Sequence, residues 1–151
     1  MAGLHPDLLR VVKRAIQITT QDFGVTAKQV RTAEEQHKLF LAGATQKDGY
    51  KSKSNHQTHG DGLGYAVDLT PYVAGKGFIP ADWNLYYPIA AAMADAARQY
   101  GVRLTWGGNW YEAINDYCHS PSDARAAVER YKAKHPGPDW IDGPHFQFAS
   151  H

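Results

Sequence analysis

A single aspartate inside an apolar run is the feature that most restricts how this chain can fold. Residues 65–69 read Tyr-Ala-Val-Asp-Leu, a short apolar stretch typical of a β-strand, and Asp68 interrupts it. Alternation along a strand places Asp68 on the same face as Ala66. Because a buried charge without compensation is costly, Asp68 requires a partner close by.

Two histidines are placed where they can supply that partner. His56 stands in the polar, glycine-rich segment that leads into this strand, and His145 begins a second strand-like run, His-Phe-Gln-Phe. Two imidazoles and one carboxylate form a ligand set suited to a catalytic zinc ion, which keeps a fourth position open for water. The sequence therefore predicts zinc bound by His56, Asp68 and His145. Asp142, three residues before His145, would be the spare carboxylate beside the metal.

Other residues compete for these places. His59 lies three residues after His56 and can replace it as a ligand. Asp61 can replace Asp68, although Asp-Gly in a glycine-rich loop is more typical of a turn. Histidines beside expected turns and helix ends are weaker candidates: His119 and His135.

Length and composition restrict the class of protein. A chain of 151 residues with 43% hydrophobic and 21% charged residues is ordinary for one globular domain with its own core. The formal net charge of +1 gives no reason to expect a nucleic acid partner. Cys118 is the single cysteine, which excludes an internal disulfide and a cysteine-based zinc cluster. No apolar stretch approaches the roughly 20 residues that cross a bilayer, so we expect no stable membrane insertion.

The periodicity of the sequence predicts an α+β fold. Apolar spacing and capping patterns predict helices over residues 7–19, 32–43 and 83–100, and from Ser120 up to Pro136. Short strands are expected at Phe23 and over residues 65–69, 102–106 and 145–149, with loops over 44–64 and 72–82. The regular βαβ rhythm is missing. We therefore expect a small, mainly antiparallel sheet flanked by three to four helices in a single domain.

The motifs that carry these residues resemble a known family. Ser54-x-His56, Gly64-x-Ala66-x-Asp68 and Asp142-x-x-His145 resemble the signature of the zinc D-alanyl-D-alanine carboxypeptidase family. More narrowly, they resemble the L-alanyl-D-glutamate peptidases of phage endolysins, and the aspartate at 142 is closer to that branch. Eleven residues separate His56 from Asp68 where the simplest pattern has six, so His59 stays an alternative ligand. Further matches occur in family order from about residue 30 onward: Arg31-Thr32, Gln36, Leu39, Gly43 and Trp106-Gly-Gly-Asn-Trp110.

The resemblance implies a zinc metallopeptidase that hydrolyses the L-alanyl-D-glutamate bond of peptidoglycan stem peptides during host lysis. It implies zinc ligation by His56, Asp68 and His145, and a catalytic acid–base role for Asp142.

Three further residues are candidates for supporting roles. Arg31 would hold the carbonyl oxygen or a substrate carboxylate, and Ser54 would hydrogen-bond a ligand or the peptide. Gln147 would accept a hydrogen bond from a zinc-bound histidine, because such histidines commonly donate their other N–H.

The expected setting follows from the same considerations. The N-terminus lacks the features of a signal peptide, so we expect accumulation in the host cytoplasm and action on the wall after holin-type release. We expect a monomer, with one catalytic domain over residues 1–151 and no separate cell-wall-binding module. Two alternatives stay open: a D,D-carboxypeptidase or dipeptidase on the same fold, and a non-catalytic zinc-stabilised binding module.

Overall fold

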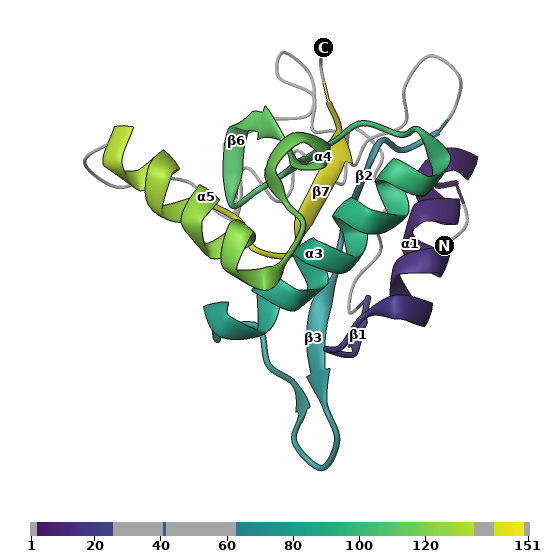
Figure 1. The fold of residues 1–151 in the computed structure, drawn as a ribbon. Coiled ribbons are helices and arrows are strands. Elements are labelled where there is room, and N and C mark those ends of the chain that lie inside the picture. The colour runs from purple at the N-terminus through teal and green to yellow at the C-terminus, as the bar shows by residue number, and fades with distance from the viewer. Residues whose placement is uncertain (1–2, 26–40, 42–62, 135–140, 150–151) are drawn as a thin grey trace.

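The computed structural model describes residues 3–25, 41, 63–134 and 141–149. Helices and antiparallel strands are mixed in these residues, which confirms the predicted α+β fold (Figure 1). The helices are α1 (Pro6–Ile18), α3 (Trp83–Tyr100), α4 (Ile114–Tyr117) and α5 (Pro121–Lys134). The strands are β1 (Phe23–Gly24), β2 (Ala66–Asp68), β3 (Thr70–Val73), β4 (Gly77–Phe78), β5 (Leu104–Trp106), β6 (Asn109–Ala113) and β7 (His145–Phe148).

The main sheet is antiparallel and has the strand order β2-β7-β5-β6. β7 follows every other described strand in the sequence, yet it lies between β2 and β5. Its first residue, His145, is paired directly with Asp68 at the end of β2. A second sheet, in the order β1-β3-β4, extends away from the first, and the β3–β4 hairpin projects from the body of the molecule (Figure 1).

Helix α3 is the centre of the helical layer, because it packs against both α1 and α5 (Figure 1). The side chain of Asp82 caps its first turn by accepting a hydrogen bond from the backbone N–H of Asn84 at 3.0 Å. Gly101 ends it in the left-handed conformation, with φ of 66°, which favours glycine. A run of buried alanines lets the neighbouring helices approach closely: Ala90, Ala91, Ala92, Ala94, Ala96 and Ala97. None of the helices in the described ranges is long and apolar enough to span a membrane.

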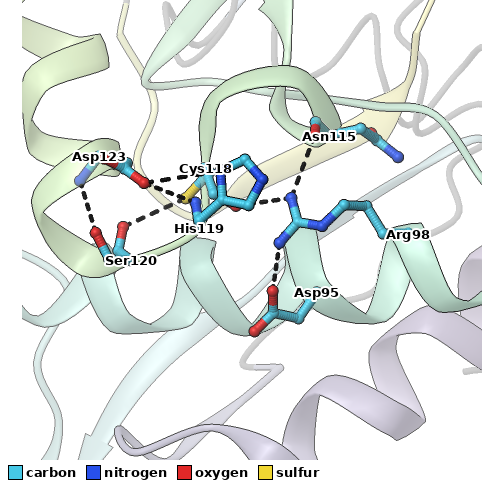
Figure 2. A network of polar contacts seen from close by, with 7 residues as sticks. All are labelled: Asp95, Arg98, Asn115, Cys118, His119, Ser120 and Asp123. Atoms are coloured by element: carbon cyan, nitrogen blue, oxygen red, sulfur yellow. Dashed lines mark hydrogen bonds and ion pairs between the residues drawn. The ribbon is translucent and has the colours of Figure 1, made fainter.

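A polar network joins α3 to the α4–α5 connection (Figure 2). Arg98 donates hydrogen bonds to the carbonyl oxygens of Asn115 (3.2 Å) and Cys118 (2.8 Å) and forms an ion pair with Asp95. His119, one of the weaker ligand candidates, belongs to this network, where its backbone N–H donates to Asp123 Oδ2 at 2.9 Å. The contacts of His119 are therefore those of a residue at the start of a helix.

The prediction of a loop over residues 72–82 is wrong in part. Pro71, which follows the strand predicted over 65–69, lies inside β3, opposite Phe23 of β1. The chain then turns at Gly75 and Gly77, which have φ of 82° and 84°, and returns as β4. Strand β6 and the short helix α4 were not predicted. The helix predicted over 32–43 lies outside the described residues, apart from the helical Leu41. Residues 44–62 of the loop predicted over 44–64 also lie outside them.

Candidate metal centre

Asp68 and His145 face each other across two neighbouring strands. Antiparallel pairing of β2 with β7 places the two residues in register, and side chains that are directly opposite come within contact distance. Asp68 Oδ1 lies 3.3 Å from His145 Nδ1. The imidazole is buried, with 8% of the residue exposed, whereas the carboxylate is partly open to solvent. The predicted juxtaposition of these two residues is confirmed.

Asp142 completes a cluster with this pair. It lies in the turn that leads into β7, where its carbonyl oxygen accepts a hydrogen bond from the backbone N–H of His145 at 3.2 Å. One ligand atom from each of Asp68, Asp142 and His145 lies within 4.8 Å of the others. Carboxylate oxygens and imidazole nitrogens are common ligands of divalent metals such as zinc, and their spacing allows a shared cation. The residues present therefore fit a metal ion.

The ring of His145 is held on several sides. Its Nε2 lies 2.8 Å from Oε1 of Gln147, two residues further along the same face of β7. The ring of Trp110 packs against it, with the two centroids 5.3 Å apart. Burial opposes protonation of His145, but the neighbouring carboxylates of Asp68 and Asp142, together with the hydrogen bond to Gln147, raise its pKa above the ordinary value. The site thus favours a positive charge at this ring.

The turn that carries Asp142 is held by the residues that follow β5. The backbone N–H of Asp142 donates to the carbonyl oxygen of Gly107 at 2.8 Å. The backbone N–H of Gly107 donates to the carbonyl oxygen of His145, also at 2.8 Å. The indole N–H of Trp106 donates to the buried carbonyl oxygen of Gly143 at 2.7 Å. These hydrogen bonds fix the backbone on both sides of Asp142.

Two glycines allow the Asp142 turn to pack closely against its neighbours. A Cβ atom on Gly107 would lie 2.1 Å from the carbonyl oxygen of Asp142, and one on Gly143 would lie 2.9 Å from the ring of Tyr86. Tyr86 is itself anchored, because its hydroxyl donates to the carbonyl oxygen of Pro80 at 2.7 Å. Burial, followed by the charges of Asp142 and Asp68, raises the pKa of Tyr86 to about 12, so this phenol stays neutral beneath the site.

Sequence reasoning did not find this support. Trp106 and the glycines after it were noted only as part of a resemblance, and Tyr86 was not singled out. The adjacent glycines at 107 and 108, directly after a predicted strand, were the available signal, since a residue without a side chain permits the close approach of another backbone.

Several predicted residues lie outside the described part of the chain: Arg31, Ser54, His56, His59 and Asp61. The structure therefore brings together Asp68, Asp142 and His145 of the predicted site. The assignment of the remaining residues stays a prediction.

Known L-alanyl-D-glutamate peptidases resemble this chain in sequence and in structure. A family model described as phage L-alanyl-D-glutamate peptidase matches residues 1–124. This chain belongs to that family. The L-alanyl-D-glutamate peptidase of Escherichia phage T5 is 31% identical over 121 residues, which cover 78% of this chain and 79% of the phage T5 protein.

A solved structure supports membership of the phage L-alanyl-D-glutamate peptidase family. The crystal structure of the Serratia marcescens L-Ala D-Glu endopeptidase ChiX is 29% identical and superposes with a TM-score of 0.65. The match covers 97% of this chain and 80% of that one. The resemblance inferred from the motifs is thus confirmed at the level of the family.

Proposed function

We propose that this chain is a zinc-dependent endopeptidase that hydrolyses the L-alanyl-D-glutamate bond of peptidoglycan stem peptides. Membership of the phage L-alanyl-D-glutamate peptidase family supports the bond and the substrate. The observation that carries the metal-dependent chemistry is the cluster of Asp68, Asp142 and His145, whose ligand atoms lie within 4.8 Å of one another.

We assign the zinc ligands to His56, Asp68 and His145, and the acid–base role to Asp142. The exposure of Asp142 beside the buried His145 supports this division, because an acid–base group must reach water and substrate. A second arrangement has Asp142 as the third protein ligand, since its carboxylate belongs to the same cluster. The zinc content of an Asp142→Asn variant separates the two arrangements.

The chemistry follows from these roles. When bound, zinc supplies Lewis acidity and lowers the pKa of water to about 7. Asp142 accepts the proton of the water that attacks the amide carbon, and then delivers it to the nitrogen of the departing amine. Asp68 contributes a negative charge that balances the cation, and Arg31 and Ser54 hold the substrate carbonyl or carboxylate.

The biological setting is part of the proposal. The protein would accumulate as a monomer in the host cytoplasm and act on the cell wall after holin-type release, as an endolysin. The relationship to a phage T5 peptidase supports this setting.

Digestion of purified peptidoglycan tests the proposed activity. New N-terminal glutamate on the stem peptide, lost with a chelator and restored by zinc, is the expected product. Free D-alanine would instead identify a D,D-carboxypeptidase, and the absence of any product would leave a non-catalytic zinc-stabilised module.

Substitution of Asp142 tests its role. Asp142→Asn should lower the hydrolysis rate roughly 10²–10⁴-fold, the range for loss of a general acid–base group, while zinc stays bound. Loss of zinc together with activity would make Asp142 a ligand. Asp116→Asn is the matched control, because this aspartate is exposed and pairs with Arg103.

A further inference from the structure

The strand that carries His145 also fixes Gln147. β7 is hydrogen-bonded on both sides, with Gln147 opposite Ala66 of β2 and Thr105 of β5. Residues two apart on a strand project from the same face, so the amide of Gln147 and the ring of His145 are held side by side. Their relative position is therefore set by the sheet.

In the hydrogen bond between these side chains, the donor and the acceptor can be assigned. Oε1 of Gln147 lies 2.8 Å from Nε2 of His145, and an amide oxygen only accepts hydrogen bonds. Nε2 must therefore carry a hydrogen. In a neutral imidazole the other nitrogen, Nδ1, then has a lone pair.

Nδ1 is the ring nitrogen beside the carboxylate of Asp68. It lies 3.3 Å from Asp68 Oδ1, so two acceptor atoms lie close together when the ring is neutral. A cation shared between them turns this unfavourable pair into two ligands on adjacent strands. The opposite tautomer would place a hydrogen on Nδ1 and leave no lone pair facing Asp68.

We propose that Gln147 is a positioning residue for the metal: it fixes the His145 tautomer in which Nδ1 is the ligand atom beside Asp68. Trp110 restrains the ring by packing, with centroids 5.3 Å apart, and Gln147 supplies the polar restraint that selects the nitrogen. This inference rests on the proposed metal-dependent function, but its test does not require peptidase activity.

The binding test titrates metal-free protein with Zn²⁺ against a chromophoric chelator. Gln147→Leu, which has no acceptor, should weaken zinc binding roughly 10–100-fold, the usual effect of losing such a hydrogen bond. Gln147→Glu retains an acceptor oxygen and should bind zinc as the wild type does. Gln99→Leu is the matched control, because Gln99 lies on the surface of α3 and accepts a hydrogen bond from Arg14. Equal zinc affinity of wild type and Gln147→Leu would overturn the inference.

A spectroscopic test can be read from the wild-type protein. In ¹⁵N-labelled, zinc-loaded wild-type protein, the imidazole hydrogen of His145 should be found on Nε2, and Gln147→Glu should keep it there. A hydrogen on Nδ1 would overturn the inference even if Gln147→Leu failed to fold.

The outcomes separate this inference from the proposed function. Wild-type protein that binds no Zn²⁺ would overturn both. Wild-type protein that binds Zn²⁺ and cleaves peptidoglycan, while Gln147→Leu binds equally well, would remove the role of Gln147 and leave the function intact.

Discussion

The indole nitrogen of Trp106 lies 2.7 Å from the carbonyl oxygen of Gly143, the residue after Asp142. Both groups are buried, and the hydrogen bond joins the end of β5 to the turn before β7. Because Asp142 has no regular secondary structure of its own, the position of its carboxylate depends on contacts of this kind.

Trp106→Phe should therefore lower activity more than it lowers zinc binding. The variant keeps an aromatic ring but leaves the Gly143 carbonyl oxygen without this donor, which costs about 1–3 kcal/mol of folding stability. Peptidoglycan hydrolysis, zinc titration and thermal unfolding measure the three effects. Trp83→Phe is the control, because it makes the same replacement at a tryptophan whose ring packs beside that of Trp106. Unchanged activity in Trp106→Phe would show that this hydrogen bond does not matter for the turn.

Gly107→Ala should displace the Asp142 turn directly. The added methyl would lie 2.1 Å from a backbone oxygen of Asp142, and backbone atoms cannot rotate away as a flexible side chain can. We expect a large loss of hydrolysis and a lower melting temperature. Gly24→Ala is a milder comparison, because its methyl would meet only the ring of Phe78 at 3.2 Å. Equal activity of the two variants would contradict the close approach at Gly107.

Zinc should stabilise the folded protein through Asp68. A ligand that binds only the folded state adds about 2.7 kcal/mol at a free concentration about 100 times its Kd. Urea unfolding with and without Zn²⁺ measures this increment. Asp68→Asn should lose most of it, since a neutral amide replaces the carboxylate beside His145. An increment of the same size in Asp68→Asn would place the bound zinc elsewhere.

Alkaline pH should destabilise the fold through Cys118. Burial, and next the charge of Asp123, raises the pKa of this thiol from 9.0 to about 12. The folded chain thus holds the proton that the unfolded chain loses, so stability is complete below pH 9 and falls as pH rises toward about 12.

Two measurements check this behaviour. Unfolding free energies measured from pH 8 to pH 10.5 should fall less steeply in Cys118→Ala than in the wild type. At pH 8 the native thiol should react with a disulfide reagent only after unfolding, because the thiolate is the reactive form. Rapid labelling of native protein would contradict the burial of Cys118.

The sequence predicted those parts of the molecule that depend on local pattern. Helix α3 was expected over 83–100 and has those bounds, because a long apolar stripe and a terminal Gly101 leave few alternatives. Asp68 and His145 were expected to share a site because each is a polar residue on the inner face of a strand. Their exact pairing required the sheet register, which sequence alone does not give.

Contacts between distant backbone segments could not be predicted. The hydrogen bond between Asp142 and Gly107 uses main-chain atoms, which are the same in every residue. The sequence therefore indicates this contact only through the choice of glycine at 107, where a side chain would not fit. The β3–β4 hairpin was missed for a related reason. Proline is usually excluded from strand interiors, so Pro71 argues against a strand at this position. The strand β3 becomes evident only from its pairing with β1 and β4.

The place of β7 has a consequence for how the protein is made. Consider a nascent chain of which residues up to the end of α5 have left the ribosome. It has β2 and β5, the two neighbours of β7, but not β7 itself, which joins them in the sheet. It also lacks His145, so it can assemble neither the middle of the main sheet nor the proposed metal centre. Hydrolytic competence should therefore appear only after β7 has left the ribosome, and products that terminate before β7 should be inert toward the wall.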